Sequence, residues 1–107
     1  MNVNEVESKY NNLIKATEKE QALGISLSVT KRNLGMQILS ATAEGKIEGK
    51  NAQARDAAAY SLFQDEHEQV ILLEQQYTDA QNTRRIAQLE VDCLRDILRV
   101  EELSKHQ

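Results

Sequence analysis

The sequence contains no proline and no tryptophan, and only four of its 107 residues are glycine. Proline removes a backbone N–H and clashes with the preceding turn, so its absence favours long, uninterrupted helices. Alanine, leucine, glutamine, glutamate, lysine and arginine are abundant, and these residues have the highest helix propensities. The composition therefore predicts an all-α fold, and the length fits a single domain, residues 1–107.

Other absences exclude whole classes of protein. No apolar run approaches 18 residues, so we expect no membrane span. The first residues show no basic region followed by an apolar stretch, so we expect no secretory signal. The single cysteine, Cys93, cannot form an intrachain disulfide, which fits a reducing compartment. Together these features predict a cytoplasmic protein without a membrane partner.

The charges are unevenly distributed. Residues 1–44 have no net charge, residues 45–55 carry +2 and residues 56–107 carry −6. An acidic surface repels the phosphate backbone, so general binding to nucleic acid is disfavoured. The short basic segment is the exception, because its cations could contact a few phosphates or an acidic protein.

The clearest turn signal lies in the middle of the chain, where Gly45 and Gly49 are four residues apart. Gly45 can adopt the left-handed conformation that ends a helix, and Asn51 can cap the next one. We therefore predict a helix over about 4–44, a turn over 45–50 and a second helix over about 51–104. A short turn between two helices gives an antiparallel two-helix hairpin.

The second helix follows a heptad pattern. With position a at Phe63 and every seventh residue after it, nine of the twelve a and d positions over six heptads are apolar. Such a sustained match predicts a long, coiled-coil-like helix. Three charged residues interrupt it, and buried ions of this kind can fix helix register; they are Glu66, Arg84 and Glu101.

Apolar residues also occupy positions c and g, among them Leu72, Ile86, Cys93 and Ile97. A face this wide is not buried well by one partner helix, so we expect a homo-oligomer, a dimer or larger, that forms a helical bundle. The predicted oligomer core consists of Phe63, Val70, Leu73, Tyr77, Val91, Leu94 and Leu98. In this interpretation Cys93 is a buried structural thiol.

The first helix is less regular. The alternation in residues 24–30 suits a strand, and Gly24 and Gly35 each weaken a helix by about 1 kcal/mol. No second strand candidate exists to pair with this segment. The sequence therefore predicts a helix with a possible break somewhere in 24–35.

The sequence offers no convincing catalytic or metal site. His67 and Glu68 begin a zinc-protease motif, but Ile71 stands where the second histidine is required, and the other histidine is His106. Residues 45–51 differ from a phosphate-binding loop in glycine spacing and in having Asn51 in place of serine or threonine. We expect no enzymatic activity and no cofactor.

The segment from Ile47 to Ala57 resembles the I-x-G-K-N-A-x-x-R signature of small helical proteins in bacteriophage and prophage genomes. The resemblance implies a phage-encoded accessory protein, often beside replication or recombination functions, that acts in the host cytoplasm. It implies no catalytic residues. Helical-hairpin secretion substrates of similar length are a competing resemblance, but their Trp-x-Gly turn is missing here.

Two functional hypotheses remain open. In the first, the chain is an oligomeric coiled-coil module that binds a protein partner, and an inhibitor of host defence is a variant of this hypothesis. In the second, basic turns contact DNA as part of a replication or recombination factor. The candidate contacts to a partner or an anion at the turn are Lys46, Lys50, Asn51 and Arg55. A simpler interpretation is structural, with Asn51 capping the helix and Arg55 paired with Glu48 or Glu44.

Overall fold

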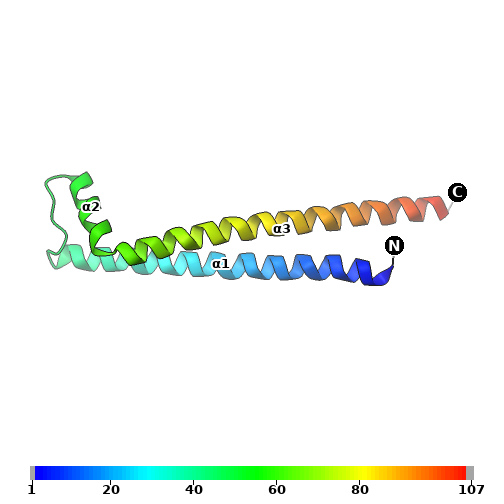
Figure 1. Ribbon diagram of the computed structural model, residues 1–107, viewed down its shortest axis with the longest axis horizontal. Helices are drawn as coiled ribbons and strands as arrows, with labels where there is room; N and C mark the ends of the chain where they lie inside the picture. Colours follow the sequence, from blue (N-terminus) through cyan, green and yellow to red (C-terminus); the bar gives the residue numbers. More distant parts are fainter. Residues whose placement is uncertain (1, 106–107) are drawn as a thin grey trace. The chain divides into compact units, whose positions relative to one another are not determined.

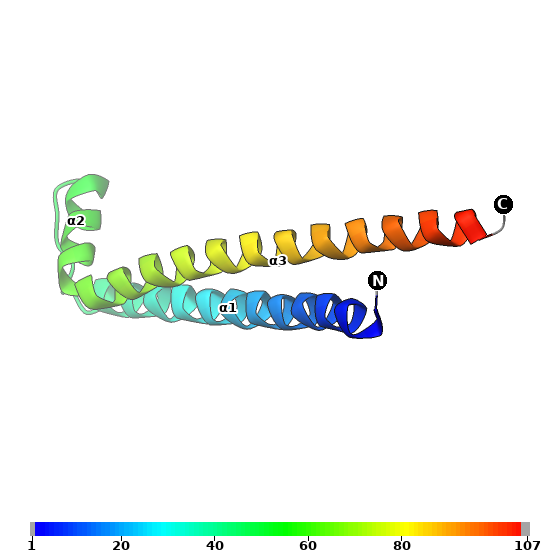
Figure 2. The ribbon, with the colours of Figure 1, turned by 45° about the vertical axis from the view of Figure 1, so that its right-hand side comes forward.

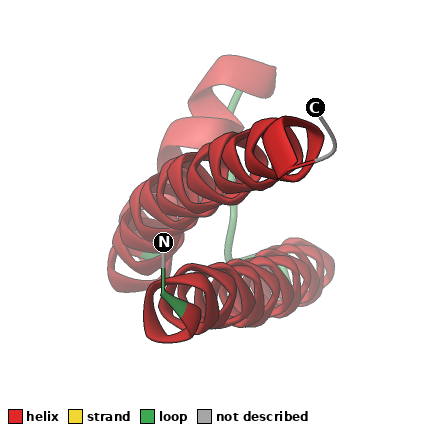
Figure 3. Ribbon diagram, turned by 90° about the vertical axis from the view of Figure 1, so that its right-hand side faces the viewer, coloured by secondary structure: helices red, strands yellow, loops and turns green. Residues whose placement is uncertain are grey.

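The computed structural model describes residues 2–105 and contains three α-helices. Helix α1 spans Val3–Ala43, α2 spans Ala52–Leu62 and α3 spans Gln64–Lys105. No strand occurs in the described residues (Figure 3). The predicted all-α class is confirmed. The chain divides into two compact units, each described here by itself: the terminal unit, Met1–Ala22 with Thr78–Gln107, and the turn unit, Leu23–Tyr77.

In the terminal unit, the beginning of α1 and the end of α3 run antiparallel (Figure 2). Two ion pairs define their register: Lys9 Nζ lies 3.1 Å from Glu90 Oε2, and Arg84 Nε lies 2.6 Å from Glu20 Oε2. The small and branched side chains between the helices are buried, which lets the two backbones approach closely. These buried residues are Ala16, Ala80, Ala87, Val91 and Leu94.

In the turn unit, the end of α1 contacts both α2 and the beginning of α3. Lys31 lies opposite Glu74, with 3.8 Å between Nζ and Oε1, and Gly24 lies opposite Tyr77. The two pairs run in opposite order along the helices, so α1 and α3 are antiparallel here as well. Ile47 reaches back from the connecting loop and is buried against α1 and α2. It joins a small apolar cluster of Ala41, Ile47 and Ala59, with Ile38, Ala58 and Phe63 packed against it.

The expected break in 24–35 does not occur, because α1 is helical without interruption from Val3 to Ala43. Packing explains why Gly24 is tolerated: a Cβ atom there would lie 3.1 Å from Cε2 of Tyr77, so the glycine makes room for the ring. The strand-like alternation arose because this helix carries apolar residues on two faces. Leu27 is half-buried, whereas Ile25 and Val29 are exposed.

The prediction of one helix over about 51–104 is wrong at a single point. The chain leaves helical geometry at Phe63, with φ −118° and ψ 41°, and α2 and α3 are separate helices on either side of it (Figure 1). The Phe63 N–H donates to the Ala59 carbonyl, and the Phe63 carbonyl accepts from the His67 N–H. The change of direction at Phe63 places its ring on the cluster around Ile47, a contact between segments distant in sequence.

Gly35 provides a direct test of the continuous helix. It is exposed, and no atom lies within 4 Å of the Cβ that alanine would add. We expect Gly35→Ala to raise the free energy of unfolding by about 0.5–1 kcal/mol, because alanine loses less backbone entropy in a helix. Gly24→Ala should gain less, since the Tyr77 ring must shift. Urea unfolding measures both, and destabilisation by Gly35→Ala would contradict a regular helix at this position.

Candidate functional site

The turn after α1 has the backbone geometry expected from its sequence. Gly45 has φ +76°, and the Lys46 N–H donates to the Ala41 carbonyl at 2.9 Å, which closes the end of the helix. Asn51 caps α2, since its Oδ1 accepts the Ala54 N–H at 2.8 Å. At Gly49 the chain passes so close to α2 that a Cβ would lie 2.7 Å from the backbone nitrogen of Arg55. These features confirm the capping roles of Gly45 and Asn51.

The charged residues of the turn do not converge on one point. Lys46 Nζ lies 2.8 Å from Glu44 Oε2. Within residues 2–105 Arg55 forms no ion pair, so its predicted pairing with Glu48 or Glu44 is wrong. The hydrogen bond from Lys46 is the main cause, and its positive charge the second, of a pKa of the Glu44 carboxyl below its ordinary value. The same contact raises the pKa of Lys46. Both side chains are well exposed, so the pair contributes little to stability.

The remaining turn candidates, Lys50 and Arg55, are exposed, as is Asn51. In the part of the chain that the structure describes, neither cation forms an ion pair with a carboxylate. Asn51 uses its side-chain oxygen for the helix cap. The turn therefore presents two separate cations, while Lys46 is already paired.

The seven residues predicted as an oligomer core are placed differently by the structure. All are buried or half-buried within the single chain. Six of them lie on the inner face of α3, and Phe63 packs against the cluster around Ile47. The heptad thus identified a face of the helix that is already covered within the single chain, and its role in an oligomer stays a prediction. The seven residues are Phe63, Val70, Leu73, Tyr77, Val91, Leu94 and Leu98.

Two of the three charged heptad positions are half-buried, and one is exposed. Arg84 meets Glu20 of α1, and the side chain of Glu20 is only 16% exposed. Glu66 is half-buried, whereas Glu101 is exposed. An acidic partner of Arg84 therefore lies in the same chain.

The contact between the helices leaves many apolar side chains exposed. On α3 of the terminal unit, a row that we call the outer α3 stripe comprises Ile86, Leu89, Cys93, Ile97 and Val100. Cys93 is exposed in the single chain, so the chain by itself does not bury the thiol as predicted. On α1 of the turn unit, a second row, the outer α1 stripe, comprises Ile25, Val29, Met36 and Leu39. The sequence places Met36 and Leu39 on a separate face of the helix, but the continuation of the row to Ile25 and Val29 was missed. The spacings of four, seven and three residues keep all four on one helix face.

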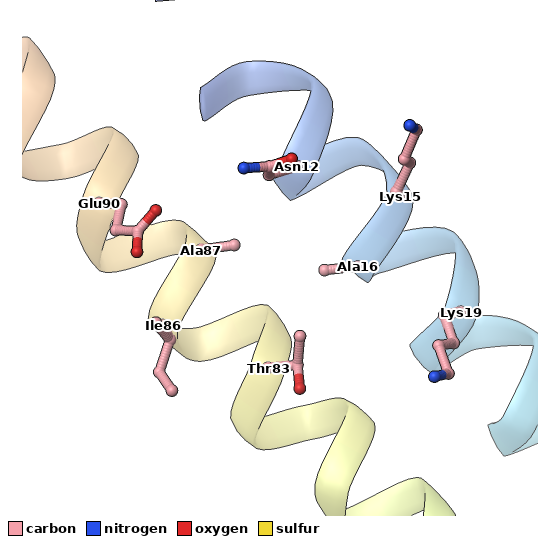
Figure 4. Close-up of a pocket in the computed structure, with 8 residues that line it drawn as sticks. All are labelled: Asn12, Lys15, Ala16, Lys19, Thr83, Ile86, Ala87 and Glu90. Atoms are coloured by element: carbon pink, nitrogen blue, oxygen red, sulfur yellow. The ribbon is translucent and has the colours of Figure 1, made fainter. Parts of the chain in front are cut away.

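The outer α3 stripe borders a groove between the two helices of the terminal unit (Figure 4). The groove has two hollows of about 370 and 430 Å³, and Glu90 lines both. In the first hollow Ala16 and Ala87 point toward one another, so small side chains form the floor (Figure 4). Lys15 and Lys19 line this hollow from α1, and Cys93 and Ile97 line the second hollow from α3.

His67 lies at the junction between α2 and α3, where it packs against another aromatic side chain. Its ring stacks on Tyr60, with 4.9 Å between centroids and 27° between planes. Its Nε2 is buried and has no hydrogen-bond partner. No group of three or more residues that could ligate a metal occurs in the described residues. His106 lies outside them.

The comparisons with known proteins find no match: no family model, no curated protein and no solved structure resembles this chain closely enough to be recognised. Among residues 2–105, none of the helices combines the length and the apolar character that crossing a bilayer requires.

Proposed function

We propose that the chain is a non-enzymatic helical module that associates with copies of itself and binds a protein partner through its exposed apolar helix faces. The resemblance of residues 47–57 to phage proteins makes a phage accessory protein of the host cytoplasm part of this proposal. The observation that carries it is the amount of apolar surface that the chain leaves open. Leu39 on α1 and Leu89 on α3 are 70% and 66% exposed, and each belongs to a continuous row.

Continuous rows of exposed apolar side chains are typical of surfaces that bind other helices or proteins rather than of catalytic sites. Exposed apolar residues scattered singly are ordinary, but contiguous apolar patches mark interaction surfaces. Helices that carry apolar residues on more than one face are typical of bundles with more than two helices. The outer stripes have the helical spacing that such packing requires.

Light scattering at several concentrations tests the self-association. We expect a mass above the 12.1 kDa of one chain at micromolar concentration. The mass should fall toward 12.1 kDa on dilution, because association follows mass action. A mass of 12.1 kDa throughout, including at the highest soluble concentration, would contradict the proposal.

A second candidate function, contact with DNA, rests on the exposed Lys50 and Arg55 near the start of α2. If it is correct, Lys50→Ala and Arg55→Ala should each lower the salt slope of DNA binding by about one unit. Absence of binding at low salt would eliminate it. The ion pair of Lys46 with Glu44 makes this candidate the weaker one, because it removes one of the three cations of the turn.

A further inference from the structure

We propose that the outer α3 stripe is a two-fold docking surface, on which the same stripe of a second copy packs in antiparallel orientation with Cys93 at the symmetry axis. This inference rests on the proposed self-association and specifies the surface and the geometry. The five residues of the stripe are exposed in the single chain, with Ile86 at 58% and Val100 at 62%.

The spacing of the stripe is symmetric about its centre. Ile86 and Val100 lie seven residues before and after Cys93, and Leu89 and Ile97 lie four residues before and after it. A two-fold interface requires that if residue i contacts residue j, then j contacts i. An antiparallel pair centred on Cys93 satisfies this condition throughout, because each apolar side chain meets an apolar side chain of the other copy.

The helical geometry keeps these residues together. At about 100° per residue, the five side chains fall within roughly a quarter of the circumference of the helix, along a length of about 21 Å. The stripe lies beside the groove rather than in the contact with α1, because Cys93 and Ile97 line the groove while Val91 is buried. A second helix can therefore approach without displacing α1.

The charges near the stripe favour the antiparallel orientation. Lys15 and Lys19 line the groove next to Ile86, at one end of the stripe. Glu101 follows Val100 at the other end and is exposed. None of these three forms an ion pair in the part of the chain that the structure describes. Antiparallel pairing brings the cations of each copy toward the Glu101 of the other, whereas parallel pairing would align like charges.

The acidic residue closest to the proposed axis along the chain is already neutralised. Asp92, the neighbour of Cys93, accepts from Arg95 at 3.0 Å and from Gln88 at 3.0 Å. The centre of the stripe is thus a thiol between apolar side chains rather than two facing free carboxylates. In this arrangement the apolar side chains hold the two copies together, and the Cys93 thiol serves to detect the contact by cross-linking.

Cross-linking by cysteine position tests the geometry. We expect mild oxidation with copper phenanthroline to join two chains through Cys93, in a disulfide formed from two thiols with the oxidant accepting the electrons. In a Cys93→Ser background, Leu89→Cys alone and Ile97→Cys alone should cross-link poorly. In the proposed pair, position 89 of one copy faces position 97 of the other, so neither variant alone brings two cysteines together. An equal mixture of these two variants should form the heterodimer several times more efficiently.

Sedimentation equilibrium supplies an independent measurement. We expect Ile97→Glu to raise the dissociation constant of the assembly at least tenfold, because a carboxylate would be placed in the apolar contact. The matched control is Ile14→Glu, an exposed isoleucine on α1 that belongs to neither stripe, which should change the dissociation constant less than twofold. Circular dichroism verifies that both variants remain helical. If Ile97→Glu unfolds, cross-linking of the mixed cysteine variants still tests the two-fold contact.

The outcomes separate this inference from the proposed function. If the chain assembles but the mixed variants cross-link no better than either alone, the two-fold stripe is overturned and self-association stands. If the wild-type chain sediments at 12.1 kDa at every concentration, both are overturned. Preferential cross-linking of the mixture, together with the effect of Ile97→Glu, would support both.

Discussion

Replacing Leu94 by alanine is expected to lower the free energy of unfolding by about 2–3 kcal/mol, toward the lower end of what buried leucine deletions cost. Leu94 is only 3% exposed, in the contact between α1 and α3 of the terminal unit. The substitution removes three buried carbon atoms and leaves a space that the neighbouring side chains fill only in part. Leu94 also lines the groove, and this open side allows some relaxation, which is why the full range is not expected.

The matched control is Leu103→Ala, on the same helix. Leu103 is 60% exposed, so its truncation should change the free energy of unfolding by less than about 0.5 kcal/mol. Urea unfolding of both variants at equal chain concentration gives the comparison, because association contributes to apparent stability. Equal effects of the two substitutions would show that α1 does not cover this face of α3.

The second large effect is expected at the ion pair inside the terminal unit. Arg84→Met should lower the free energy of unfolding by about 1–3 kcal/mol, since it leaves the carboxylate of Glu20 without this charged partner. The contact between Arg84 Nε and Glu20 Oε2 is short, 2.6 Å, and the Glu20 side chain is 16% exposed. A carboxylate so little exposed to water loses hydration that the guanidinium replaces.

A double variant separates the interaction from the size of the side chains. Glu20→Met combined with Arg84→Met should recover most of the lost stability, because the double variant removes the Glu20 carboxylate together with the guanidinium that it binds. A double-mutant cycle by urea unfolding measures the coupling. If the two single losses simply add in the double variant, Glu20 and Arg84 do not interact as described.

The seam along α3 could be predicted because its signal is periodic and local. The heptad selected Val70, Val91 and Leu94, and all three are buried. It also placed Arg84 on this seam, but it did not identify the Glu20 carboxylate that Arg84 meets. That assignment depends on which residues of α1 lie opposite, and the length and path of the turn set this register.

The end of α2 could not be predicted for a different reason. Neither a glycine nor a proline marks Phe63, and its neighbours favour a continuous helix. At the break Phe63 packs against the cluster of Ala41, Ile47 and Ala59, which Ile47 joins from the loop. Conversely, Gly24 suggested a break in α1, but the helix continues and the glycine instead makes room for the Tyr77 ring. Contacts between distant segments outweighed local propensity at both positions.

The candidate surface was predicted only in part. Ile86, Cys93 and Ile97 were correctly placed on a widened apolar face, but that face was treated as a continuation of the core. One neighbouring helix covers only the a and d positions, so the structure leaves the rest exposed. At the turn, the capping residues were predictable because caps are local, whereas the partner of Glu44 was not.

An isotope-filtered NMR experiment on mixed chains tests most directly whether copies of this protein cover its exposed apolar surface. Equal amounts of ¹³C-labelled and unlabelled chain are dissociated, mixed and reassembled, and nuclear Overhauser effects between the two populations are recorded. The account predicts intermolecular effects between apolar side chains of the outer α3 stripe, with Ile97 methyls of one copy near Leu89 methyls of the other. Absence of any intermolecular effect at millimolar concentration, with intramolecular effects intact, would contradict it.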